Sequence, residues 1–258
     1  GELNHKQAFP VSLALWALGS LYQGNFKDAE EQIKAGEAKA RETSSYLFSY
    51  IIPYVIEAWL YLGRLQEALG AAQEARDLVT STGNTEIETR LWVFMGEIHA
   101  RLGENPAARS YFERARDHAS KASEPHMVAK AEKGLGWMDM LEGKLDTAAE
   151  HLDKALKLSK QLGMRYHEAD DLRLQGHLAM AKSEQGEALG FFQEAVDLAA
   201  ELKAPALESV ALHGMAKATS DASKAKVWLK DGKTKLAILL EQLSEENQGH
   251  FLSFMERA

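Results

Sequence analysis

The chain of 258 residues has no cysteine, only 5 prolines, and no apolar run near the roughly 20 residues that a membrane-spanning helix needs. The absence of cysteine excludes disulfides, iron–sulfur clusters, zinc sites with cysteine ligands and thiol nucleophiles. Asp and Glu number 38 against 30 Lys and Arg, which gives a net charge of -8. A chain with this balance has no overall attraction for nucleic acid or anionic lipid, although it can carry a local basic patch.

The N-terminus lacks a starting Met, and residues 1–7 do not form a signal peptide. We therefore expect a cytoplasmic protein and a piece excised from a longer polypeptide. The content of 45% hydrophobic and 26% charged residues is typical of a folded globular chain.

The composition favours helices. Ala, Leu, Glu and Lys dominate long stretches, which leaves little for a strand. Pro10, Pro125 and Pro205 suit helix entrances, where proline is well tolerated. Pro53 lies between apolar residues of helical spacing and predicts a kink or a late helix start. The predicted fold class is all-α.

An alanine recurs in a similar context in steps of 39, 40, 40, 40 and 37 residues, at Ala29, Ala68, Ala108, Ala148, Ala188 and Ala225. A glycine stands five residues before the first four alanines, at Gly24, Gly63, Gly103 and Gly143, and Ser183 and Ser220 replace it in the last two repeats. Such a glycine ends a helix in the left-handed region and lets the chain turn into the next helix. One helix pair cannot bury its apolar face alone, so successive pairs must stack.

These repeats resemble the tetratricopeptide repeat. The third repeat carries the resemblance through Trp92, Met95, Gly96, Gly103, Ala108, Phe112 and Ala115, and the fourth through Leu135, Gly136, Gly143, Leu145, Ala148, Leu152 and Ala155. The family repeat is about 34 residues long, so the period here is similar to the lengthened variety in the repeat arms of bacterial multidomain signalling regulators. The resemblance implies a right-handed α-solenoid of about six helix-turn-helix repeats at residues 10–235, after a lead-in at residues 1–9. In this register, His213 falls where earlier repeats have a helix-crossing glycine.

Residues 236–258 differ from the repeats. Leu236, Leu239, Leu240 and Leu243 form an apolar stripe, and Ser244 can cap a last helix that carries Phe251, Leu252, Phe254 and Met255. One interpretation is a cap on the open edge of the last repeat. The other is a docking or dimerisation segment, or a lead into a missing domain.

No motif for catalysis, a metal or a cofactor is found. Gly134 and Gly136 lack the third glycine of a dinucleotide fingerprint and follow no strand. The 9 histidines are scattered without a metal-binding spacing, and adjacent carboxylates such as Asp170 and Asp171 point in different directions on a helix. We therefore expect no enzyme, no metal and no cofactor.

The resemblance implies that the first helix of each pair lines an inner, concave face. The residues predicted to bind a partner in this groove are Arg90, Glu97, Arg101, Lys130, Lys133, Trp137, Met140, Arg173 and His177. Basic side chains recur at one helical level, with aromatic and thioether groups between them, which suits an extended segment that carries carboxylates. Trp137 fits packing between repeats equally well, and Trp16, Trp59, Trp92 and Trp228 are expected in the core.

The function predicted is a non-catalytic scaffold that binds a protein or peptide segment, within a larger signalling or regulatory protein. The alternative is a sensor arm in which a small ligand binds near Trp137 and His177 and regulates an absent output domain. The carboxylate clamps and the peptide-pheromone receptors of this family use asparagines on the inner helices. The asparagines here are expected outside those helices, so neither site is expected; they are Asn4, Asn25, Asn84, Asn105 and Asn247. Neither nucleic acid nor a membrane is an expected partner.

Overall fold

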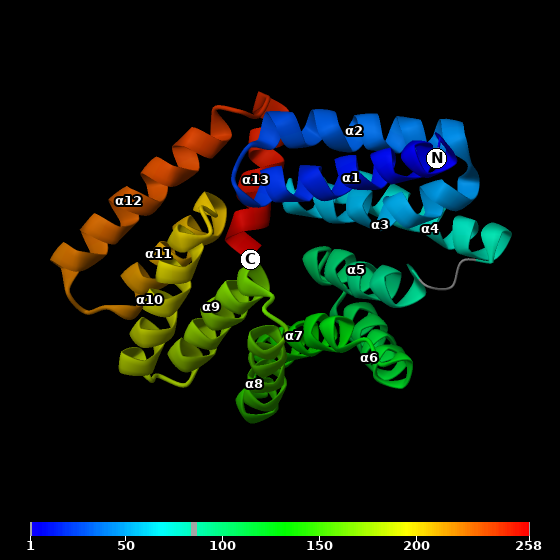
Figure 1. The fold of residues 1–258 in the computed structure, drawn as a ribbon. Coiled ribbons are helices and arrows are strands. Elements are labelled where there is room, and N and C mark those ends of the chain that lie inside the picture. Colours follow the sequence, from blue (N-terminus) through cyan, green and yellow to red (C-terminus); the bar gives the residue numbers. More distant parts are fainter. Residues whose placement is uncertain (1, 84–86, 258) are drawn as a thin grey trace. The chain divides into compact units, whose positions relative to one another are not determined.

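The computed structural model describes residues 2–83 and 87–257, with the side chains of residues 2–8, 246 and 253–257 left out. Within this part of the chain there are thirteen α-helices and no strand, as the composition predicts (Figure 1). Every described helix is too short or too polar to cross a membrane.

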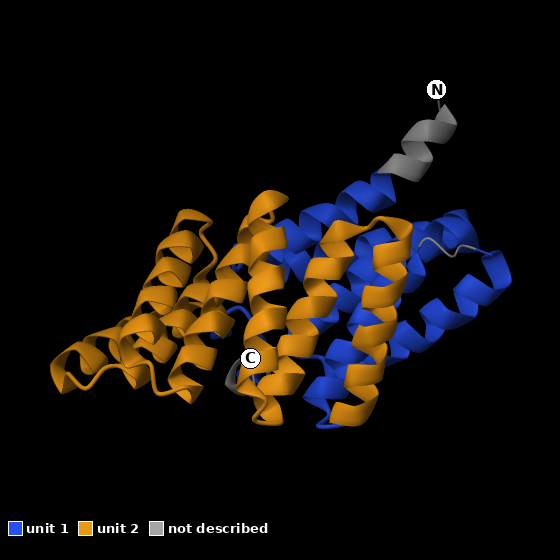
Figure 2. Ribbon diagram, turned by 90° about the horizontal axis from the view of Figure 1, so that it is seen from below, with its two compact units in different colours: residues 1–104, 240–258 blue, residues 105–239 orange. Residues whose placement is uncertain are grey.

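The chain divides into two compact units, coloured separately in Figure 2. Unit 1 holds residues 1–104 and 240–258, and unit 2 holds residues 105–239. The helices of unit 1 are α1 (Glu2–Tyr22), α2 (Phe26–Thr43), α3 (Ser45–Tyr61), α4 (Leu65–Thr82), α5 (Glu88–Arg101) and α13 (Glu245–Arg257). Those of unit 2 are α6 (Asn105–Ala122), α7 (Pro125–Leu141), α8 (Leu145–Gln161), α9 (Arg165–Ala181), α10 (Gln185–Glu201), α11 (Pro205–Ala218) and α12 (Ala222–Leu240), whose last residue falls in unit 1.

Consecutive helices pack as pairs joined by tight turns. Gly24, Gly63, Gly103 and Gly143 all have a positive φ, between 73° and 80°, as the turn prediction requires. Ser183 adopts the same conformation with φ 65°. The repeating helix pairs of the predicted solenoid are thus present in both units.

Glycines inside the helices make room for large side chains of neighbouring helices. A Cβ at Gly134 would lie 2.6 Å from Phe112 Cδ1, and one at Gly176 would lie 2.7 Å from Phe192 Cε1. Both phenylalanine rings are fully buried. Each ring fills the space that a missing side chain leaves, which holds the helices close together.

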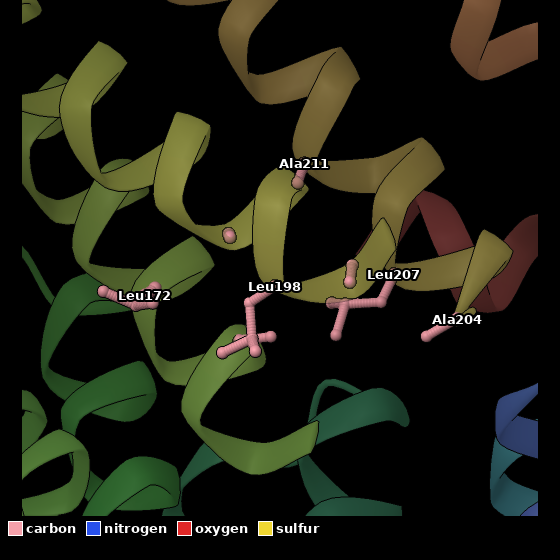
Figure 3. Packing of buried hydrophobic residues seen from close by; sticks show 8 residues of the cluster. Leu172, Leu198, Ala204, Leu207 and Ala211 are labelled. Atoms are coloured by element: carbon pink, nitrogen blue, oxygen red, sulfur yellow. The ribbon is translucent and has the colours of Figure 1, made fainter. Parts of the chain in front are cut away.

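The core of unit 2 continues from pair to pair. Leu198 of α10 lies between Leu172 of α9 and Leu207 of α11 (Figure 3). The side chain of Trp228 on α12 packs against a second cluster that includes Phe192. Each pair therefore completes its core with residues of the next pair, as expected for stacked repeats.

The sixth helix pair corrects the predicted register. The helices α7, α9 and α11 begin at Pro125, Arg165 and Pro205, each 40 residues after the last. The three residues missing from the sixth repeat are missing from the end of its first helix, because α11 has 14 residues where α9 has 17. Thr219, which follows α11, has an extended backbone. His213 is therefore exposed and does not occupy the helix-crossing position, which falls on the buried Ala216, 40 residues after Gly176.

Four local expectations were wrong in whole or in part. Helix α1 begins at Glu2, so Pro10 lies within it, and so does Asn4, which was expected outside a first helix. Helix α3 runs from Ser45 through Pro53, so of the two expectations for Pro53 the late start is wrong and the kink stays a prediction. Trp16, expected in the core, is 64% exposed.

The C-terminal segment returns to the first helix pairs. Phe251 of α13 is fully buried, with its ring centroid 5.0 Å from that of Phe26 on α2. The cap interpretation assigned Phe251 to the last repeat and did not predict this contact. The side chains of Phe254 and Met255 lie outside the described residues, and the domain boundaries at residues 9 and 235 stay predictions.

Candidate partner-binding surface

The first helices of three successive pairs in unit 2 carry basic side chains at equivalent positions. Because α7, α9 and α11 start 40 residues apart, Lys133, Arg173 and His213 share one level of the repeat. We define the basic surface as Lys130, Lys133, Trp137, Arg173, His177, His213 and Lys217.

An ion-pair network links the first two of these helices. Lys133 Nζ lies 2.8 Å from Asp170 Oδ2, while Arg173 Nη2 lies 2.8 Å from Asp170 Oδ1. Burial raises the pKa of Asp170, but the two cations outweigh it and hold the pKa well below its usual range. Asp170 is therefore ionised at neutral pH and fixes both basic side chains in place.

Burial and nearby cations lower the pKa values of two histidines of the basic surface. Burial, followed by the charges of Arg173 and Lys217, lowers the pKa of His177 to about 3. The pKa of His213 is also lowered, by burial and by Lys217 and Lys233. Both imidazoles are therefore neutral at pH 7, and Lys217 of α11 belongs to the same electrostatic environment as Arg173 of α9.

Burial and the cations of α7 also lower the pKa of a third histidine, His167. Burial and the charges of Lys130 and Lys133 lower the pKa of His167 well below its usual value, while Asp170 acts in the opposite direction. With the histidines neutral, the cations Lys130, Lys133, Arg173 and Lys217 outnumber the carboxylates of Asp170 and Asp171 in this region, although the whole chain has a net charge of -8. This positive region is the electrostatic feature that distinguishes the surface.

The side chains of the surface differ in exposure. The side chain of Arg173 is only 5% exposed, so its guanidinium positions Asp170 more than it faces solvent. Lys130, Lys133, Trp137 and His177 are half-buried, and His213 and Lys217 are exposed. The accessible positive charge is therefore carried by the lysines.

Met140 packs into the core of unit 2. It is partly buried against a cluster that includes Leu152 and Leu174. His177 similarly makes an edge-on contact with the Phe192 ring, at 5.0 Å between ring centroids. Both residues thus connect the surface to the packing beneath it.

The other predicted site residues belong to unit 1. The guanidinium of Arg90 lies 5.1 Å from the centre of the Tyr54 ring. Tyr22 donates a hydrogen bond of 2.8 Å to Glu57, and its pKa is raised well above 10 by burial, by Glu57 and, to a smaller extent, by the charge of Glu97. Arg101 is half-buried. These three site residues, Arg90, Glu97 and Arg101, lie on α5 and are described apart from those of unit 2.

Sequence reasoning missed His213 and Lys217. The step of 37 residues between Ala188 and Ala225 displaced the sixth first helix by three residues. Pro125 and Pro205, 80 residues apart at the first turn of α7 and α11, were the signal that gives the correct register. No group of three or more potential metal-ligating side chains comes together in the described part of the chain.

Comparison with known proteins finds a family match for part of the repeat region. Residues 86–161 match the family model of the tetratricopeptide repeat. No curated protein matches the chain in sequence.

Solved structures show the same fold. A Rap protein in complex with competence and sporulation factor matches with a TM-score of 0.67 and 15% identity, over 95% of this chain and 72% of that one. A STAND protein with a tetratricopeptide repeat sensor from Pyrococcus horikoshii matches with a TM-score of 0.57 and 12% identity, over 95% of this chain and 41% of that one. BtubC from P. vanneervenii has a TM-score of 0.51 and 18% identity, over 92% of both chains.

Proposed function

We propose, from the tetratricopeptide repeats of residues 86–161, that this chain is a non-catalytic scaffold that binds an acidic segment of another protein or of its own parent polypeptide. The observation that carries the proposal is the row of cations on α7, α9 and α11, within an acidic chain. Such a surface attracts carboxylates and repels basic segments, which favours one class of partner.

The proposed roles follow from exposure. Lys217, which is exposed, and Lys130, which is half-buried, bind carboxylates of the partner. Arg173 and Asp170 hold Lys133 in position through the ion pairs described above. Trp137 supplies an apolar contact between the charges. The Rap protein in complex with competence and sporulation factor is a precedent for a ligand held by this fold.

The test uses two labelled peptides, one of alternating Glu and Leu and one of alternating Lys and Leu. Fluorescence anisotropy should show binding of the acidic peptide only, with an affinity that falls as salt is added. The double variant Lys130→Glu/Lys217→Glu should weaken this binding by about tenfold or more.

The matched control is Lys157→Glu/Lys160→Glu, which changes the net charge equally on exposed positions of α8. The control should leave the affinity within about twofold of that of the parent chain. Binding at the basic surface depends on the charges at that surface more than on the net charge of the chain. Equal losses in the two double variants, or equal binding of the two peptides, would contradict the proposal.

The sensor alternative makes a different prediction. A small ligand that binds the native state alone raises the melting temperature of the chain. If a metabolite panel raises it and substitution Trp137→Ala removes the effect, while neither peptide binds, the sensor hypothesis replaces the scaffold.

A further inference from the structure

Helix α13 docks on the turns of the first two helix pairs within unit 1. Phe251 inserts its ring against Phe26, edge-on at an interplanar angle of 63°. Tyr61 also lies near Phe26, with its ring centroid 6.2 Å from that of Phe26 and 5.5 Å from that of Tyr22. The fully buried Phe251 ring thus packs on α2, next to an aromatic cluster from α1, α2 and α3.

Gln242 binds the turn between α1 and α2 through two hydrogen bonds. Gln242 Oε1 accepts from the backbone N–H of Phe26 at 3.0 Å, and Gln242 Nε2 donates to the carbonyl of Gly24 at 2.7 Å. One amide side chain therefore satisfies both a donor at the start of α2 and an acceptor of the turn before it. This arrangement selects a carboxamide, since an acid or an amine matches only one of the two groups.

The second turn permits a very close approach of the α13 backbone. A Cβ at Gly63 would lie 2.6 Å from the carbonyl carbon of His250 and 3.0 Å from the Phe251 nitrogen. Gly103 occupies the equivalent turn position, also with positive φ, and has open space around it. The contact at Gly63 is thus specific to α13 and not required by the turn.

The docked helix depends on this contact for its order. Helix α13 has 13 residues, and isolated helices shorter than about 12–15 residues are marginal in water. The residues that hold the C-terminal segment lie more than 180 positions earlier in the sequence, at Gly24, Phe26 and Gly63. We call these three residues the clasp site.

We infer that the clasp site is a binding site for a segment in which a turn that carries a glutamine is followed, nine residues later, by a phenylalanine anchor on a helix, and that residues 241–252 occupy it as the chain's own ligand. A partner helix of the same chemistry reaches the site only when it displaces α13. This interaction surface is separate from the basic surface of unit 2, and the inference does not depend on the proposed function.

The experiment supplies the segment in trans to the full chain. A labelled peptide of residues 241–258 is added to the variant Gln242→Ala/Phe251→Ala, whose own tail lacks both anchoring groups. Anisotropy should show saturable binding, at least tenfold tighter than to the parent chain, whose tail competes. The same peptide with Phe251→Ala should not bind.

Glycine variants provide the matched control. Adding Gly63→Ala to the double variant should abolish binding, whereas adding Gly103→Ala, which imposes the same backbone strain in open space, should leave the affinity unchanged. Equal binding to parent and double variant, equal loss in the two glycine variants, or no binding to a folded double variant overturns the inference.

A second measurement decides the matter if the double variant does not fold. In the otherwise unmodified chain, Gly63→Ala should remove amide-exchange protection from residues 247–252, and Gly103→Ala should preserve it. Unchanged protection in the Gly63→Ala chain overturns the inference.

Discussion

Lys133 of α7 places its Nζ 2.8 Å from Oδ2 of Asp170 on α9, so a charge of one helix pair is neutralised by the next pair. Arg173 binds the other carboxylate oxygen of Asp170. The pair therefore contributes to the interface between repeats as well as to the basic surface.

Substitution Asp170→Asn should have opposite effects on stability and on binding. It leaves the nearly buried Arg173 without its carboxylate partner, and we expect a loss of about 2 kcal/mol in the free energy of unfolding. It also removes the negative charge among the cations, so the acidic peptide should bind more tightly. Urea unfolding and anisotropy measure the two effects.

The pH dependence of this loss has a definite sign. The pKa of Asp170 is lowered in the folded chain, so its stabilisation is complete above the unfolded value of 3.8 and is lost as pH falls below it. The difference between parent and Asp170→Asn should therefore be constant from neutral pH down to about pH 5 and shrink in stronger acid. A difference that grows in acid would refute the assignment.

The neighbouring Asp171 should behave in the opposite way. It is 2% exposed and accepts a hydrogen bond of 2.6 Å from Ser159 Oγ. Burial raises its pKa from 3.8 to about 7, so between these values the folded chain holds more protons than the unfolded chain and loses stability as pH rises.

Asp171→Asn keeps an acceptor for Ser159 and removes the charge. At about pH 8 we expect the variant to be more stable than the parent by about 1–3 kcal/mol, with the gain disappearing near pH 4. Chemical unfolding across this pH range is the measurement. A variant less stable than the parent at every pH would show that the ionised carboxylate stabilises the fold.

The helix pairs could be predicted because their signals are local. The glycine at each turn and the alanine at each crossing follow from backbone freedom and close packing, and both recur along the chain. The basic side chains of α7 and α9 followed from the same register. The register failed at α11. This helix is three residues shorter than α9 at its C-terminal end, so a constant offset from the alanine no longer locates the first helix of the pair.

The ion pairs and the docking of α13 could not be predicted in the same way. Whether Arg173 faces solvent or Asp170 depends on a rotamer and on burial by neighbouring helices. The contact of Phe251 with Phe26 joins residues 225 positions apart, and no repeat pattern relates them. Trp16 was assigned to the core by its apolar spacing, but hydrophobic residues at such spacing are also found on exposed faces.

Replacing a helix-interior glycine by alanine should change the stability of the chain in opposite directions at two positions. Gly134→Ala places a methyl group against the buried Phe112 ring, and we expect a loss of about 1–3 kcal/mol despite the better helix propensity of alanine. Gly190→Ala on α10 meets nothing within 4 Å and should add about 0.5–1 kcal/mol. Thermal unfolding of the two variants provides the comparison, and a gain at both positions would contradict the packing role of Gly134.

His151 of α8 lies between two buried carboxylates of α7. Its Nδ1 contacts Glu132 Oε2 at 2.5 Å, and its Nε2 lies 3.6 Å from Asp139 Oδ2. Glu132 and Asp139 are 1% and 3% exposed, whereas Lys154, which also binds Glu132, is half in solvent. His151 is therefore the more buried partner of Glu132, whereas Asp139 is held more closely by Arg109, whose Nη2 lies 2.6 Å from its Oδ1.

His151→Ala should cost about 2–4 kcal/mol, because it leaves a buried carboxylate with fewer partners. Glu132→Gln removes the charge that needs them, so the double variant should be more stable than the sum of the two single losses by at least about 1 kcal/mol. Urea unfolding of the parent, the two single variants and the double variant completes the double-mutant cycle. Losses that simply add would mean that His151 and Glu132 act independently.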